Sequence, residues 1–360
     1  MSDPTPQPQS QPLVLVTGGT GFLAKWVLVH LLQQNYRVRT TIRTPSRTPE
    51  IHSSLLEAGI AESQLSSLEI VTADLLSAQG WSDALKDVIY VLHIASPFPN
   101  APPKNEDELI KPAVEGTRRV LRFAKEARVK RVVVTSSAAA IFYGPASKEK
   151  RRFTEDDWTD LSGSRDSVPL YPRSKTLAER AAWEFMETES EGGDSGMELT
   201  VVNPVMIYGP ALGKEDGTSL RGVGEFLDGN APGIPRLQFG IVDVRDCARM
   251  HLLAMTEPKA AGERFICIGE GSMWMGDIAK LLKKNLGEKA GKVPTMALPD
   301  FVVKLVALVM PIARLVLHDL GVEREIVGEK AREVLGWKWE YTSEQALLAA
   351  AESLVKYEGK

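Results

Sequence analysis

Short apolar runs of strand length alternate with longer stretches of helical periodicity through the first half of the chain. The strand-like runs are rich in Val and Ile and largely lack polar alternation, as in PLVLVT (12–17) and KRVVVTSSA (130–138). Such runs are typical of strands that are buried on both faces of a parallel sheet. Because strand–helix units repeat and their crossovers are right-handed, the pattern predicts an α/β fold with a doubly wound parallel sheet.

The same pattern predicts the individual elements by residue number. We expect strands at 12–17, 36–43, 68–75, 88–96, 130–138 and 198–209, and helices at 22–34, 51–65, near Trp81, at 106–127 and from Tyr171 onward.

The pattern also divides the chain into a tail, a sheet domain and a lobe. Residues 1–12 are rich in Pro and Gln and contain no apolar segment, so we expect a disordered tail rather than a signal peptide. Residues 13–207 are assigned mainly to the sheet domain. Beyond Tyr208 the elements shorten and Pro and Gly become frequent, which predicts a smaller C-terminal lobe at 208–360. We expect the chain to return to the sheet domain near 241–255 and 264–268.

The composition is that of an ordinary globular protein and argues against a polyanionic partner. The 360 residues are 43% hydrophobic and 25% charged, and the net charge of −4 offers no basic excess to neutralise phosphates. We therefore expect no nucleic acid partner. The two cysteines, Cys247 and Cys267, lie in apolar surroundings and are expected to be core residues rather than a disulfide.

The most apolar run of the chain, FVVKLVALVMPIARLVL (301–317), is interrupted by Lys304, Pro311 and Arg314. A membrane-spanning helix needs about 20 consecutive apolar residues. We therefore predict a buried or lobe-capping helix in this region, with interfacial membrane contact as the alternative. With no transmembrane segment expected, the predicted location is the cytoplasm.

The segment VTGGTGFLA (16–24) has the spacing of a phosphate-binding turn between a strand and a helix. Gly18 permits a tight turn, Gly21 lets backbone N–H groups approach a pyrophosphate, and Ala24 allows the helix to pack closely on the sheet. The triplet follows a buried strand and opens an amphipathic helix, which is the context that a dinucleotide site requires. The sheet is therefore predicted to be of the Rossmann type. The turn residues predicted to bind the dinucleotide are Gly18, Thr20, Gly21, Phe22 and Leu23.

The end of the second strand indicates which dinucleotide is bound. An NAD site usually has an acid about 20 residues after the turn, where it holds the adenosine ribose. No Asp or Glu lies between Gly21 and Glu50, and the segment carries Arg43 and Arg47 instead. Guanidinium groups can bind the 2′-phosphate of NADP through charge-assisted hydrogen bonds. We therefore predict NADP(H) as the cofactor, with a solvated strand end as the alternative role of the arginines.

Two further strand ends are predicted to contact the cofactor. In TADL, Asp74 would accept a hydrogen bond from the adenine amino group while Leu75 covers the ring. In HIASPF, Ala95, Ser96 and Pro97 would lie beside the diphosphate and ribose, because ligands of open α/β sheets bind at the carboxyl ends of the strands. A helix-capping role is the alternative for Ser96.

The segment YPRSKTLAE places Tyr171 and Lys175 four residues apart on one face of a helix. A phenol with a pKa of about 10 is a poor acid–base catalyst at neutral pH, and an ammonium within about 4–6 Å favours its ionised form. This spacing alone is common. It gains meaning from the preceding strand VVVTSS, whose hydroxyl groups are predicted to lie at the same sheet edge.

Taken together, these motifs resemble those of the extended short-chain dehydrogenases/reductases. The resemblance is greatest to the branch of dihydroflavonol reductases, cinnamoyl-CoA reductases and yeast-type methylglyoxal reductases within the NAD-dependent epimerase/dehydratase superfamily. The matching segments are VTGGTGFLA, HIASPFP, VEGT, VVVTSSAA, YPRSK, NPVMIYGP, DVRDCARMHLLAM and KAREVLGW, which run in the family's order from about Leu13 to Trp337.

The resemblance implies an NADPH-dependent reduction of an aldehyde or ketone. Tyr171 would be the general acid, Lys175 its pKa partner, and Ser137 the donor to the substrate carbonyl, with Ser136 as the alternative donor. Pro204 and Val205 would lie along the nicotinamide. The C-terminal lobe would bind the substrate.

Two positions depart from the wider family. Many of its members complete a proton relay with an asparagine where this chain has Ala113. This departure leaves the expected activity unchanged but does not identify the groups that would relay the proton. Plant dihydroflavonol reductases hold the flavonoid with an asparagine where this chain has Phe142, which argues against a flavonoid and for an apolar pocket. The predicted pocket residues are Phe98, Phe142, Tyr143, Met206 and Tyr208. For Phe98 and Met206 ordinary core packing is an equal alternative.

We expect a small-molecule carbonyl substrate, no metal, and a monomer or homodimer. The five histidines are scattered without metal-ligand spacing. Three alternatives remain open at this stage: a nucleotide-sugar epimerase or dehydratase with bound NAD, a 3β-hydroxysteroid or sterol dehydrogenase, and a dinucleotide-sensing regulator without catalytic activity.

Overall fold

A seven-stranded parallel sheet forms the centre of the protein. The computed structural model describes residues 11–96, 105–145, 152–164, 167–191, 196–214, 217–230, 233–309, 314 and 316–358. The strand order is β10-β7-β5-β4-β1-β2-β3, and all pairs in this sheet are parallel. Its strands are β1 (Leu13–Val16), β2 (Arg37–Ile42), β3 (Leu68–Thr72), β4 (Tyr90–His93), β5 (Arg131–Thr135), β7 (Glu198–Pro204) and β10 (Arg264–Cys267). The predicted doubly wound parallel sheet is therefore confirmed.

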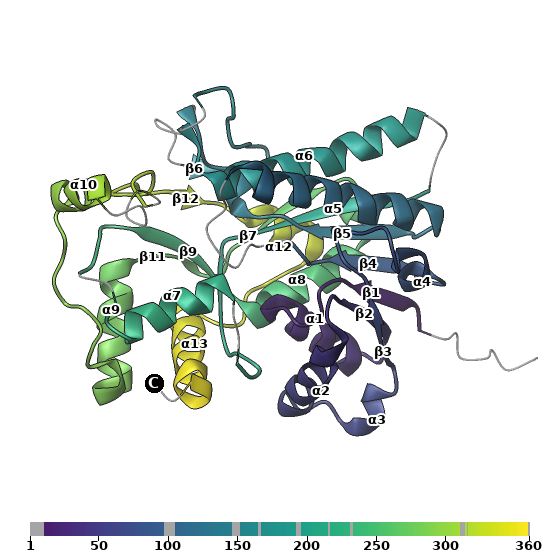
Figure 1. The fold of residues 1–360 in the computed structure, drawn as a ribbon, viewed down its shortest axis with the longest axis horizontal. Coiled ribbons are helices and arrows are strands. Elements are labelled where there is room, and N and C mark those ends of the chain that lie inside the picture. The colour runs from purple at the N-terminus through teal and green to yellow at the C-terminus, as the bar shows by residue number, and fades with distance from the viewer. Residues whose placement is uncertain are drawn as a thin grey trace, which may run out of the picture.

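Helices cover both faces of this sheet (Figure 1). Along β1, Val14 and Val16 face one apolar core and Leu13 and Leu15 face the other, as the alternation of side chains in a strand requires. The helices on the first face are α1 (Phe22–Gln33), α2 (Thr48–Glu57), α3 (Glu62–Leu65) and α8 (Val244–Thr256); those on the second are α4 (Trp81–Leu85), α5 (Asp107–Glu126) and α6 (Leu170–Glu191). All side chains of β1 are buried, which explains its unbroken apolar sequence.

A smaller lobe lies beside the carboxyl ends of the strands (Figure 1). Its three-stranded sheet has the order β11-β9-β8, and the helices at 218–227, 275–286 and 343–358 pack around a separate apolar core. The elements are β8 (Met206–Tyr208), β9 (Gln238–Asp243), β11 (Gly271–Trp274), α7 (Thr218–Leu227), α9 (Met275–Leu286), α10 (Asp300–Val309) and α13 (Ser343–Glu358). A two-stranded sheet of β6 (Arg152–Phe153) and β12 (Glu325–Ile326) lies at the border, and α12 (Glu329–Leu335) packs on α8 and β10.

The segment 198–209, predicted as one strand, forms two strands in different sheets. β7 lies in the large sheet and β8 in the small one, and Val205 separates them. Pro204 lacks a backbone N–H and so cannot continue the ladder as a donor, which favours a break at this point. The predicted helix at 51–65 is likewise divided, because Gly59 with a φ of +86° ends α2 before α3 begins.

The two predicted returns of the chain to the large sheet, near 241–255 and 264–268, are made by a helix and by a strand, respectively. β9 belongs to the small sheet, whereas α8, which follows it directly, packs against α1 on the large one. β10 is an edge strand of the large sheet. The domain boundaries themselves stay a prediction, and residues 1–10 of the predicted tail lie outside the described part of the chain.

Cys247 and Cys267 are fully buried and carry free thiols, as predicted for core residues. Within the described part of the chain, no helix has the length and apolar character needed to cross a lipid bilayer.

Candidate functional site

The glycine turn between β1 and α1 has the geometry that a phosphate group requires. Gly18 has a φ of +74°, and a Cβ at this position would lie 2.9 Å from the Cβ of Ala95. Gly21 is the N-cap of α1; it is exposed, has extended backbone angles, and receives no side-chain cap. The first turn of a twelve-residue helix therefore presents its N–H groups at an open, positively polarised end. These residues fit the diphosphate of a dinucleotide.

Two threonines hold this turn in place, although the sequence motifs do not indicate them. The Thr41 hydroxyl accepts a hydrogen bond from the Gly18 N–H at 3.0 Å, and the Thr41 carbonyl accepts one from Gly19 at 2.9 Å. The Thr17 hydroxyl accepts hydrogen bonds from the backbone N–H groups of Ile94 and Ala95, each at 3.0 Å. β1 is thereby joined to both of its neighbours, β2 and β4, at the point where the turn begins.

The two arginines after β2 have different surroundings. Arg43 is exposed and has no hydrogen-bond or ion-pair partner among the described residues. Arg47 makes a bidentate contact with Glu50, with Nε–Oε2 and Nη2–Oε1 distances of 2.7 and 2.9 Å. Glu50 also pairs at 3.0 Å with the fully buried Lys25 of α1, and these cations hold the pKa of Glu50 below its usual value against the opposing effect of partial burial. Of the two predicted phosphate ligands, Arg43 is therefore the better placed.

Asp74 and Leu75 lie directly beyond the end of β3, which neighbours β2. The backbone N–H of Ala73 donates to the carbonyl of Ile42 at 3.1 Å, so Asp74 and Arg43 lie at the same sheet edge. One oxygen of the half-buried Asp74 accepts from the N–H of Leu76 at 2.9 Å. This turn fixes the carboxylate at the predicted adenine end of the site.

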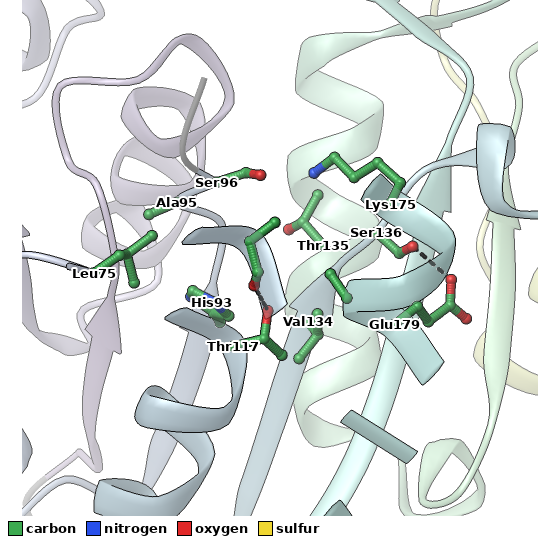
Figure 2. Close-up of a pocket in the computed structure, with 12 residues that line it drawn as sticks. Leu75, His93, Ala95, Ser96, Thr117, Val134, Thr135, Ser136, Lys175 and Glu179 are labelled. Atoms are coloured by element: carbon green, nitrogen blue, oxygen red, sulfur yellow. Dashed lines mark hydrogen bonds between the residues drawn. The ribbon is translucent and has the colours of Figure 1, made fainter. Parts of the chain in front are cut away.

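A small cavity lies between the ends of β4 and β5 and helix α6 (Figure 2). Among the residues predicted from the sequence, Leu75, Ala95, Ser96, Lys175 and the alternative donor Ser136 line it. Figure 2 shows the Lys175 ammonium pointing toward Ser96 across the cavity. With a volume of about 20 Å³, the cavity is large enough for a water molecule but too small for a nicotinamide ring.

The three predicted catalytic residues come from neighbouring elements. Tyr171 lies in the first turn of α6 and is 40% exposed, and the Lys175 Nζ is 5.9 Å from the centre of its ring. Ser137 caps the 3-10 turn Ala138–Ala140, which packs against α6, and its Oγ accepts from the N–H of Ala139 at 3.1 Å. Its hydroxyl hydrogen is still available to donate.

Ser136, the alternative donor, lines the cavity, but its hydroxyl hydrogen is already engaged. It is buried, and its hydroxyl donates to the Glu179 carboxylate at 2.5 Å (Figure 2). The geometry therefore favours Ser137 over Ser136 as the group that faces a substrate.

His93 at the end of β4 also lines the cavity and is neutral. Because the Thr17 hydroxyl already accepts two backbone N–H groups, its own hydrogen is directed to Nδ1 of His93, at 2.9 Å. Complete burial, with the nearby Lys175 ammonium as a second cause, lowers the pKa of His93 to about 3. His93 therefore adds no positive charge to the cavity at neutral pH.

Pro204 and Val205, predicted to lie along the nicotinamide, follow the end of β7. Pro204 is buried, whereas Val205 is half-buried and donates its N–H to the Cys267 carbonyl at 3.1 Å. Phe22 and Leu23 in the first turn of α1 contribute to the apolar cores. The structure gives no further contact that assigns these four residues a ligand, and their roles stay predictions.

The predicted substrate side contains an ion pair that the motifs did not indicate. Tyr143 donates its hydroxyl to Asp319 at 3.0 Å, and Asp319 pairs with Arg324 at 2.7 Å. The guanidinium lies over the rings of Phe142 and Tyr143, at 4.8 and 5.0 Å from their centres. Burial and the Asp319 carboxylate raise the pKa of Tyr143 above its usual value, so its hydroxyl stays protonated and holds this orientation.

The other residues predicted to line the substrate pocket differ in how deeply they are buried. Tyr208 is 5% exposed and packs in the core of the small lobe, which raises the pKa of its hydroxyl. Met206 is half-buried against the same core. Pro97 and Phe98 lie outside the described residues. In the described part of the chain, no group of three or more His, Cys, Asp or Glu side chains is arranged to bind a metal.

The chain is similar to a known protein family, to plant reductases and to solved reductase structures. The profile of the NAD dependent epimerase/dehydratase family matches residues 14–269. Cinnamoyl-CoA reductase 1 of Petunia hybrida is 34% identical over 276 residues, which are 77% of this chain and 78% of the relative.

Two solved structures are similar over nearly the whole chain. The complex of yeast methylglyoxal/isovaleraldehyde reductase Gre2 with NADPH has a TM-score of 0.78 and 28% identity, and the match covers 96% of this chain and 99% of that chain. The NADPH complex of Gre2 from Candida albicans has a TM-score of 0.76 and 25% identity, with the same coverage of both chains.

Proposed function

From the membership of this chain in the NAD dependent epimerase/dehydratase family, we propose that it is an NADPH-dependent reductase of small to medium-sized aldehydes or ketones. The family resemblance that the motifs indicate is confirmed by the profile match and by the relatives that are named reductases. One observation carries the finer proposal: the glycine turn, the arginine after β2 and Ser96 follow the ends of neighbouring strands at one edge of the large sheet, and Lys175 of α6 points toward Ser96 across the cavity.

The cofactor would lie along this edge. The N-terminus of α1 at Gly21 would hold the diphosphate, Arg43 the 2′-phosphate, and Asp74 and Leu75 the adenine. Lys175 would donate to the hydroxyl groups of the nicotinamide ribose. The absence of an acid at the end of β2, together with the NADPH bound by both Gre2 structures, supports NADP(H) over NAD.

The side chains of this protein would supply binding, orientation and a proton. When bound, NADPH provides the hydride that reduces the carbonyl carbon. Tyr171 donates its phenolic proton to the carbonyl oxygen, and the Lys175 ammonium favours the phenolate that remains. Ser137 donates a hydrogen bond to the same oxygen, whose negative charge grows during the reaction.

The substrate side favours a compact apolar carbonyl compound. Phe142 and Tyr143 contribute aromatic surface, and the nearby Arg324 is already neutralised by Asp319. An arginine that is paired in this way offers little to a substrate carboxylate, because a second anion would have to compete with Asp319. This arrangement supports aldehydes, ketones and diketones over acidic substrates.

The proposal is tested with purified protein and a panel of aldehydes, diketones and β-ketoesters. We expect NADPH oxidation with at least one member of the panel and much slower oxidation of NADH. Tyr171→Phe should lower kcat by about 100- to 10,000-fold, which is the usual contribution of general acid catalysis. NAD that copurifies with the protein would favour an epimerase or dehydratase, and full activity of Tyr171→Phe would show that another group is the acid.

A further inference from the structure

Glu179 is a buried carboxylate beneath the site, and the proposed function does not use it. It lies on α6, one helical turn after Lys175 and two turns after Tyr171, and it is 1% exposed. It therefore shares the helix face that carries the two proposed catalytic groups.

The two carboxylate oxygens of Glu179 have different partners. Oε1 accepts a hydrogen bond from Nε of Arg264 at 2.5 Å. Oε2 accepts one from the Ser136 hydroxyl at 2.5 Å and one from the Asn203 amide at 2.8 Å. Hydrogen bonds to a charged acceptor are about twice as strong as neutral ones, and such short lengths are typical of them.

Each donor on the Oε2 side directly precedes a residue of the proposed site. Ser136 precedes Ser137 after the end of β5, and Asn203 precedes Pro204 within β7. Asn203 also donates to the backbone carbonyl of Ser137 at 3.2 Å. The carboxylate thus fastens the catalytic helix α6 to the ends of two strands of the large sheet.

We propose that Glu179 is a positioning residue, whose Oε2 sets the separation between the Ser137 hydroxyl and the Tyr171–Lys175 pair. This inference rests on the proposed function, in which these groups act on one carbonyl oxygen. Catalytic groups must be held within about 0.5 Å of the productive geometry. A misplacement of about 1 Å can lower a rate about 100-fold.

A purely structural role of Glu179 would instead rest on Oε1, which accepts from Arg264 and, at 3.5 Å, from the indole N–H of Trp183 on the same helix. This guanidinium is buried, but it also donates to the carbonyl groups of Glu155 and Asp157 at 2.8 and 3.0 Å, and it lies 3.7 Å from the ring centre of Trp158. Arg264 therefore keeps three other contacts. The Oε1 and Oε2 sides can be separated by substitution, because they involve different donors.

Ser136→Ala removes one bond to Oε2 and leaves the ion pair with Arg264 intact, whereas Glu179→Gln changes both sides. We expect kcat to fall about 10-fold in Ser136→Ala and about 100-fold in Glu179→Gln. The KM for NADPH should change less than about 2-fold, because the cofactor contacts are retained. Since both changes act through one interaction, the double variant should be no slower than Glu179→Gln alone.

Glu198→Gln is the matched control. Glu198 pairs with Arg131 at 2.7 Å and joins the same two strands, β5 and β7, at their opposite ends. This variant weakens a glutamate–arginine pair between the same strands, with a more exposed glutamate, at the end away from the proposed site, and it should keep the kcat of the wild type. If Glu179→Gln does not fold, Ser136→Ala and this control still decide the question.

Crystal structures of the wild type and Ser136→Ala supply a readout that needs no turnover. We expect the distance between Ser137 Oγ and Tyr171 Oη to change by more than about 0.5 Å. An unchanged distance together with wild-type kcat would overturn the positioning role of Glu179, even if melting temperatures fall. Full activity of Tyr171→Phe would instead overturn the proposed function, so the two failures are distinguishable.

Discussion

Arg43 and Arg47 are close in sequence, but only one of them is available to an incoming phosphate. Because Arg47 is engaged by Glu50, we expect Arg43 to provide most of the binding energy for the 2′-phosphate. A charge-assisted hydrogen bond contributes about 1.5–3 kcal/mol, so Arg43→Ala should raise the KM for NADPH by about 10- to 100-fold and leave that for NADH nearly unchanged. Arg47→Ala should have a smaller effect. Steady-state kinetics with both cofactors measure this, and equal effects on NADPH and NADH would argue against phosphate recognition.

The burial of neutral His93 predicts that the protein is sensitive to acid. In the unfolded chain His93 binds a proton below about pH 6.5, whereas in the folded protein its pKa is about 3. Between these values the unfolded state holds the additional proton. The free energy of unfolding should therefore fall with decreasing pH, by about 1.4 kcal/mol per pH unit from this group.

Urea unfolding of the wild type and His93→Gln between pH 6.5 and pH 4.5 measures this contribution. We expect a shallower dependence on pH in the variant, because glutamine does not titrate. The other acidic and basic groups are common to both proteins and cancel in the comparison. Parallel curves for the two proteins would show that His93 is protonated in the folded state.

At the scale of single elements, Gly18 in the turn after β1 has a left-handed backbone conformation and lies close to Ala95. Gly18→Ala should lower the free energy of unfolding by about 1–3 kcal/mol, because a non-glycine residue is strained at a φ of +74° and its Cβ would meet Ala95. It should also weaken NADPH binding, since the turn would shift. Gly59→Ala is the matched control: Gly59 has a φ of +86° and no atom within 4 Å of its added Cβ. Equal losses of stability and unchanged NADPH affinity in both variants would contradict a role for close approach at Gly18.

Local sequence was sufficient to predict most elements of the large sheet, and the exceptions have a physical reason. Continuous Val and Ile runs indicated buried strands, and Gly18, Gly21 and Ala24 indicated the first turn. The pairing of a strand depends on partners far along the chain, so the apolar pattern of 198–209 did not indicate that β7 and β8 belong to different sheets. Pro204 was the only local signal of that break.

In the proposed site, too, the sequence indicates residues that are close together in the chain but not their distant partners. The spacing of Tyr171 and Lys175 on one helix is visible in the sequence, and Glu179, one turn further, continues that face. Its partner Arg264 is 85 residues away, and the partner of Tyr143, Asp319, is 176 residues away. No periodicity connects such positions, because only the folded chain brings them together.

At the scale of the whole molecule, Trp337 joins the C-terminal segment to α8 and to the apolar core on one face of the large sheet. It lies between α12 and α13, is 2% exposed, and donates its indole N–H to the backbone carbonyl of Asp246 at 3.0 Å. Trp337→Ala should lower the free energy of unfolding by about 3–5 kcal/mol, as expected when a buried tryptophan is truncated.

Trp339→Ala serves as the control, because Trp339 is two residues away and 37% exposed. Denaturant unfolding followed by circular dichroism should show a large shift of the midpoint for Trp337→Ala and a small one for Trp339→Ala. Similar midpoints for the two variants would show that the contact of this segment with the large domain contributes little to stability.

The strand order has a consequence for how such an enzyme can diversify. From β1 the chain builds β2 and β3 on one side, and only then crosses to β4, β5, β7 and β10 on the other. The residue proposed to select the coenzyme therefore lies on one flank of the β1–β4 boundary, and the proposed proton donor and its supports lie on the opposite flank. Apart from the cofactor, which both flanks would contact, the groups on the two flanks share no partner among those described above, and substitutions at such separated sites act nearly independently. We therefore expect that a lineage or a protein engineer can exchange the coenzyme preference at Arg43 while the groups proposed to act on the carbonyl are retained.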